Sequence, residues 1–194
     1  NNERVTVTAG INEENSHYIL DGKKTFVTPE FAMTYSNAGK GGVSREFHRW
    51  ARNYKLHQGN RLHEILLNSW EACYFNINED RLVDLATKAA SVGIELLVMD
   101  DGWFGKRNDD TSSLGDWKVN PAKLPNGLKT LVDRVKETGV DFGIWVEPEM
   151  VSVDSDLYRA HPDWALTDGF EPVFGRNQLL LDLTKQEVRD YIVE

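Results

Sequence analysis

The amino-acid sequence predicts an α/β fold: the N-terminal part of a (β/α)8 TIM barrel, preceded by antiparallel β structure and a linking helix. After residue 60, strand-like and helix-like segments alternate, which is typical of a parallel sheet covered by helices. The predicted strands end in acidic residues and tryptophan, as at the reaction face of a barrel. A complete barrel takes about 250 residues, so residues 61–194 can hold only its first three βα units.

Residues 1–42 are predicted to contain antiparallel β structure. Asp21-Gly22 is a hairpin turn signal, and strand-like segments lie on both sides of it. The predicted strands are residues 18–20, 25–27 and 31–35.

Residues 43–60 are predicted to form the linking helix, because apolar residues recur there at helical spacing. These residues are Val43, Phe47, Trp50 and Tyr54. The preceding Gly-rich segment, residues 37–42, is interpreted as a flexible turn.

No nucleotide-binding glycine motif follows any predicted strand, so an open nucleotide-binding sheet has little support.

The remaining residues, 61–194, are predicted to alternate between strands and helices. Gly93 and Gly139 each follow a predicted helix and precede a predicted strand, so the same helix-to-strand turn occurs twice. Thr184 and Glu187 have the spacing of a capping box and predict the start of the last helix. The predicted strands are 62–69, 94–99 and 141–146, and the predicted helices are 79–91, 127–138 and 184–194.

Composition excludes several classes of partner. Lys plus Arg number 22 against 31 Asp plus Glu, a net charge of −9, so we expect neither nucleic acid nor a membrane surface as a partner. The single cysteine, Cys73, favours a reducing, cytoplasmic compartment. It has no ligand partner and His63-Glu64 lacks a second histidine, so no metal site is expected. The missing initiator Met and the end within a helical pattern suggest a piece of a longer protein.

Asp100 and Asp101 are the first candidate site residues, because they end the apolar run of residues 96–99. Paired carboxylates beside Trp103 suit a neutral ligand rich in hydroxyl groups, such as a sugar. Strand alternation would place only one of the two acids in the pocket unless the chain already turns at Gly102. The other acid would then cap the loop.

Trp70 and Trp145 follow two other predicted strands and are candidates for ligand contact, with core packing as the alternative. An indole can cover the apolar face of a sugar ring while its N–H remains available to a hydroxyl. Glu147 and Glu149 could form a catalytic pair, but a supporting role in hydrogen bonding is favoured for both. The segment around Trp117 could be either a lid or a wall.

Together these motifs resemble bacterial α-galactosidases of glycoside hydrolase family 36, from about residue 20 to the last residue. Residues 28–54 resemble the end of that family's N-terminal β-sandwich and its linking helix. The motifs are Asn68-Ser-Trp-Glu-Ala-Cys-Tyr-Phe75, Met99-Asp-Asp-Gly-Trp-Phe104, Leu114-Gly-Asp-Trp117, Gly143-Ile-Trp-Val-Glu-Pro-Glu-Met150, Arg176-Asn177 and Leu181-Asp-Leu-Thr184.

The resemblance implies a retaining hydrolase that removes terminal α-linked galactose from oligosaccharides such as raffinose and melibiose. It implies no cofactor and an oligomer at full length. It also implies that galactose contacts fall to five residues: Asp100, Asp101, Trp70, Trp145 and Arg176.

The family's nucleophile and acid/base aspartates are expected C-terminal to Glu194, so the resemblance implies that this piece alone is inactive. Four alternatives remain open. Two belong to the same class, an α-N-acetylgalactosaminidase and a galactosyl transferase. The others are a sugar-binding module without catalysis and a metal-dependent barrel lyase or isomerase.

Overall fold

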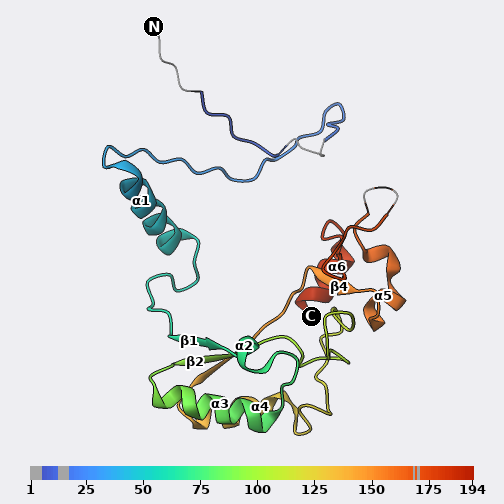
Figure 1. Ribbon diagram of the computed structural model, residues 1–194. Coiled ribbons are helices and arrows are strands. Elements are labelled where there is room, and N and C mark those ends of the chain that lie inside the picture. The colour runs from blue at the N-terminus through green and yellow to red at the C-terminus, as the bar shows by residue number, and fades with distance from the viewer. Residues whose placement is uncertain (1–5, 13–17, 168, 170) are drawn as a thin grey trace. The chain divides into compact units, whose positions relative to one another are not determined.

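The computed structural model describes residues 6–12, 18–167, 169 and 171–194. The chain divides into two compact units, Asn1–Leu62 and His63–Glu194 (Figure 1).

In the first unit, the turn predicted at Asp21-Gly22 is present, closed by a hydrogen bond of 3.1 Å from Lys24 N–H to the Asp21 carbonyl. The strands predicted on either side of it, and the one at 31–35, are not found: residues 18–38 form no strand. A hairpin is marginal without further strands or a helix packed against it, and Val27 stays 83% exposed.

The first helix, α1, spans Gly39–Tyr54 and so begins within the Gly-rich segment that was predicted to be a turn. The residues that precede the helix explain why it can begin among glycines. The Ser36 hydroxyl accepts the Ala38 N–H at 3.0 Å, and a Cβ on Gly42 would lie 2.1 Å from that hydroxyl oxygen. Glycine at position 42 therefore lets the preceding chain pack against the first turn of the helix.

The second unit contains a parallel sheet of β1 (Leu66–Asn68), β2 (Leu96–Met99) and β3 (Asp141–Ile144), in the order β1-β2-β3. The predicted α/β class and parallel order are confirmed, although each strand is shorter than its predicted range. Leu97 and Met99 of the central strand are fully buried.

Helices α3 (Glu79–Ser91) and α4 (Gly127–Glu137) follow β1 and β2 in the chain, and they lie side by side along the sheet (Figure 1). Both predicted helices are confirmed. Gly93 and Gly139 have φ of +84° and +86°, the left-handed conformation that glycine adopts without strain as it ends a helix.

We expect Asn78→Ala to destabilise the protein by about 1 kcal/mol, because Asn78 caps the first turn of α3. Its side-chain oxygen accepts the Arg81 N–H at 2.9 Å. The thermal midpoint of the purified protein measures the effect. Asp84→Ala on the exposed face of the same helix is the control, and an equal loss in both variants would contradict the capping role.

A second, antiparallel sheet follows β3, in the order β4-β6-β5. The sequence pattern did not predict it, because strands of two or three residues carry no readable alternation. The elements that were not predicted are α2 (Trp70–Cys73), β4 (Met150–Ser152), α5 (Asp156–Ala160), a 3-10 turn (Pro162–Trp164), β5 (Phe174–Gly175) and β6 (Gln178–Leu180).

The last helix, α6, spans Gln186–Val193, and the predicted capping box at its start is wrong. Asp182 Oδ1 accepts both the hydroxyl of Thr184 at 2.6 Å and its N–H at 3.0 Å. Thr184 is thus held by the preceding turn, and the N-cap residue is Lys185.

The loop between β2 and α4 joins the two sheets. Leu114 and Ser152 are linked by two hydrogen bonds, from Leu114 N–H to the Ser152 hydroxyl at 3.1 Å and from Ser152 N–H to the Leu114 carbonyl at 2.9 Å. The Asp116 carboxylate accepts the N–H groups of Asp156 and Leu157, both at 2.9 Å, at the start of α5. These bonds hold the segment in place, which argues against a lid, and Trp117 packs against Trp103 and Phe104 of the core.

Candidate functional site

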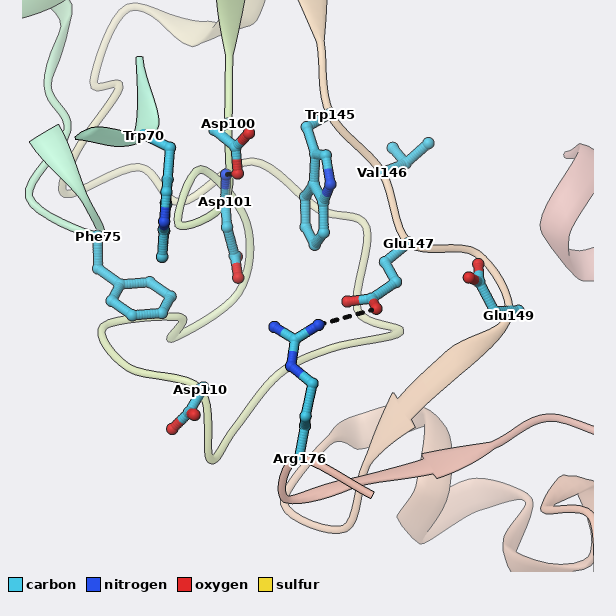
Figure 2. Close-up of a pocket in the computed structure, with 10 residues that line it drawn as sticks. All are labelled: Trp70, Phe75, Asp100, Asp101, Asp110, Trp145, Val146, Glu147, Glu149 and Arg176. Atoms are coloured by element: carbon cyan, nitrogen blue, oxygen red, sulfur yellow. Dashed lines mark hydrogen bonds and ion pairs between the residues drawn. The ribbon is translucent and has the colours of Figure 1, made fainter. Parts of the chain in front are cut away.

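A pocket of about 430 Å³ lies at the carboxyl ends of β1, β2 and β3. Figure 2 shows side chains converging on it from all three strand ends and from the hairpin between β5 and β6. All five residues predicted to contact a ligand are among those that line it. The lining residues are Trp70, Phe75, Asp100, Asp101, Asp110, Trp145, Val146, Glu147, Glu149 and Arg176.

Both acids of the Asp100-Asp101 pair line the pocket. Strict strand alternation would have placed only one of them there, but the chain turns at Gly102. Gly102 has a φ of +103°, and the Asp101 N–H donates to Asp100 Oδ1 at 2.7 Å. The chain has therefore left the strand conformation before it can send the second acid to the opposite face.

Asp100 is held by neutral groups at the end of β1. Its Oδ2 accepts from Asn68 Nδ2 at 2.6 Å, and its N–H donates to the Ser69 hydroxyl at 3.0 Å. Asn68 Oδ1 in turn accepts the Trp70 N–H at 2.7 Å. Asn68 thus ties the ends of two strands together, a role that its place in the motif did not reveal.

Asp101 is held by a cation that the sequence reading missed. Arg107 is 1% exposed and donates from Nε and Nη2 to the Asp101 carboxylate. As one charge in a polar loop, Arg107 carries no signal of burial in the sequence.

A second, half-buried cation, Lys123, holds the same loop. Lys123 Nζ donates to three main-chain carbonyls: Phe75 at 2.8 Å, Gly102 at 2.8 Å and Arg107 at 2.7 Å. Burial lowers the pKa of this ammonium from its usual value. It links the backbone that follows the acid pair to the backbone at Phe75, which follows α2.

Trp70 and Trp145 lie on opposite sides of Asp101 in the pocket (Figure 2). Trp70 packs edge-on against Phe75, with ring centroids 5.0 Å apart. The main chain at Trp145 is held by Trp103, whose Nε1 donates to the Trp145 carbonyl at 3.0 Å. Both predicted indoles therefore border the pocket and also pack against other rings, Trp70 against Phe75 and Trp145 against Trp117, whose ring centroid lies 6.4 Å away.

Arg176 reaches the pocket from the turn between β5 and β6. Arg176 and Asn177 have φ of +52° and +61°, the left-handed pair typical of a two-residue hairpin turn. The guanidinium points toward Glu147, with Nη1 3.8 Å from Oε1 (Figure 2). Arg176, a predicted site residue, is thus carried by a short antiparallel sheet that the sequence pattern did not predict.

Glu147 is a partly buried carboxylate that lies between Trp145 and Arg176 in the pocket (Figure 2). Burial raises its pKa above the usual value, and Arg176 acts in the opposite direction. Its Oε2 is buried and has no hydrogen-bond partner among the described residues.

A glutamate whose folded pKa is raised contributes stability below its ordinary pKa of 4.5, and that contribution is lost as the pH rises through the folded value. We therefore expect Glu147→Gln to gain thermal stability relative to the parent protein between pH 4 and pH 7.

Asp182→Asn is the matched control, because hydrogen bonds from Thr184 lower the pKa of Asp182 and reverse the sign. The parent protein should lose stability relative to that variant as the pH falls. Thermal midpoints at pH 4 and pH 7 test Glu147→Gln, and midpoints below the ordinary pKa of 3.8 test Asp182→Asn. Parallel pH curves for Glu147→Gln and the parent protein would contradict the raised pKa.

Within residues 6–12, 18–167, 169 and 171–194, no group of three or more His, Cys, Asp or Glu side chains is arranged to hold a metal ion. In the same part of the chain, every helix is too short or too polar to cross a bilayer.

Comparison with known proteins gives a consistent result. A family model described as Melibiase matches residues 25–194. The bifunctional α-galactosidase/sucrose kinase AgaSK of Mediterraneibacter gnavus is 52% identical over 189 residues, which is 95% of this chain and 20% of that protein.

Two solved structures are also similar. The GH36 α-galactosidase AgaB from Geobacillus stearothermophilus is 50% identical with a TM-score of 0.88, covering 95% of this chain and 26% of that one. A variant of AgaA from the same organism, in complex with raffinose, is 51% identical with a TM-score of 0.74, covering 78% and 22%. The chain therefore spans about a quarter of the length of the proteins that it matches.

Proposed function

The chain belongs to the Melibiase family, glycoside hydrolase family 36, and from this premise we propose that it forms the galactose-recognition part of a retaining α-galactosidase. The observation that carries the proposal is the pair of carboxylates, Asp100 and Asp101, between two indoles in one pocket.

Each element of this pocket suits a galactose ring. A carboxylate that accepts a hydroxyl proton makes a charge-assisted hydrogen bond worth about 1.5–3 kcal/mol. The indoles of Trp70 and Trp145 can cover the apolar face of the ring, and the Arg176 fork can bind further hydroxyls or hold Glu147 in place.

The substrates we propose are α-galactoside oligosaccharides of the raffinose and melibiose type. The raffinose complex of the AgaA variant supports this class, since that chain and this one are 51% identical.

We place the nucleophile and the acid/base aspartate on strands that follow Glu194 in the whole enzyme. Retaining hydrolysis needs two carboxyl groups about 5–5.5 Å apart. Glu147 and Glu149 are given supporting roles, because Glu147 already faces Arg176 in the pocket wall.

The finer architecture follows from the same premise. Residues 61–194 would supply the first three βα units of a (β/α)8 barrel, residues 43–60 the linking segment, which contains most of α1 (Gly39–Tyr54), and residues 1–42 the end of a β-sandwich. The β1-β2-β3 parallel order supports the first of these. We also propose a cytoplasmic homo-oligomer without metal or organic cofactor, in keeping with the single cysteine.

The test is release of nitrophenol from p-nitrophenyl α-galactoside by the full-length protein, with and without a chelator. We expect activity that survives chelation, and none from the 194-residue chain alone. Preference for p-nitrophenyl α-N-acetylgalactosaminide would redirect the proposal to that sugar. Galactose binding without hydrolysis by the full-length protein would identify a binding module instead.

A further inference from the structure

The two acids of the pocket are held in different ways. Both oxygens of Asp100 accept from neutral groups, the Asn68 amide and the Asp101 N–H. Asp101 instead faces a guanidinium: Arg107 Nε lies 3.0 Å from Oδ1 and 3.1 Å from Oδ2, and Nη2 lies 2.8 Å from Oδ2.

This ion pair is almost completely removed from water, with the side chains of Arg107 and Asp101 1% and 8% exposed. Asp101 lines the pocket, whereas Arg107 is not among the lining residues. The guanidinium therefore contacts the pocket acid from behind.

Arg107 is itself fixed on several sides. Its Nη1 donates to the Ser112 carbonyl at 2.9 Å, and its own carbonyl accepts from Lys123 at 2.7 Å. The guanidinium carbon lies 5.5 Å from the ring centroid of Phe75, which lines the pocket. A planar fork held this way fixes the rotation of the carboxylate that it binds, which a single ammonium cannot do.

We propose that Arg107 is a positioning residue for galactose binding: it sets the orientation of the Asp101 carboxylate toward the sugar hydroxyls. The inference rests on the proposed function and adds to it a residue outside the pocket that acts through Asp101.

The test measures galactose affinity by calorimetry on the full-length protein. Arg107→Lys keeps the charge but loses the fork, and we expect the Kd to rise about tenfold, the loss of one good charge-assisted hydrogen bond. Arg134→Lys is the matched control, because Arg134 pairs with the buried Glu79 between α3 and α4, away from the pocket. We expect its Kd to stay within about twofold of the parent value.

A double-mutant cycle separates positioning from general destabilisation. In an Asp101→Asn background, Arg107→Gln should change the Kd little. The double variant leaves no buried charge unpaired, so it remains usable if Arg107→Lys fails to fold. Additive effects of the two changes would overturn the proposal, as would Arg107→Lys with a lower thermal midpoint but an unchanged Kd. If the parent protein itself binds no galactose, the proposed function fails instead.

Discussion

Asp100→Asn in the full-length protein is expected to lower kcat/KM for p-nitrophenyl α-galactoside by roughly a hundredfold, about 3 kcal/mol. Asp100 lines the pocket, and its two oxygens already accept from Asn68 and from the Asp101 N–H. The amide would replace one acceptor oxygen with a donor, so that it would both weaken the contact with a sugar hydroxyl and clash with one of these fixed donors.

Steady-state kinetics of the variant would measure this loss. Asp133→Asn is the control, because Asp133 forms an exposed pair with Lys129 on α4 and should leave kcat/KM unchanged. A loss within twofold for Asp100→Asn would remove this acid from the binding site.

Phe104→Ala is expected to destabilise the unit His63–Glu194 by about 3–5 kcal/mol, because it leaves a cavity in the core. Phe104 is 0% exposed. Its ring centroid lies 5.1 Å from that of Trp103 and 4.6 Å from that of Trp117.

The thermal midpoint and the rate of native-state proteolysis would register this change. Phe174→Ala removes the same side chain from β5, where it is 60% exposed, and should have a much smaller effect. A loss for Phe104→Ala as small as that expected for Phe174→Ala would show that the cluster around Phe104 contributes little to stability.

The long, periodic elements were predictable from the sequence. The prediction of α3 depended on acidic residues in its first turn and on the terminating glycine Gly93, and the observed range matches it. The Asn78 cap emerged only from the structure. The parallel order of the three strands followed from the alternation of elements. The short second sheet could not be predicted, because two or three residues do not establish a period.

The site was predictable where an acid or an indole follows a strand, as with Asp100 and Trp145. Arg176 came only from the family resemblance, since the hairpin that presents it has no pattern. Arg107 escaped detection because its burial leaves no pattern in the sequence. Lys123 escaped it because one of its partners, the carbonyl of Phe75, lies far away in the sequence.

The Lys123 ammonium binds main-chain carbonyls only at Phe75, Gly102 and Arg107, so this clamp does not depend on which side chains those positions carry. Selection or design could therefore vary residue 75, which lines the pocket, and with it the shape of the pocket, on an unchanged backbone. The backbone around the acid pair is thus fixed independently of the side chain that lines the pocket at position 75. A change in sugar preference there is compatible with retention of the fold.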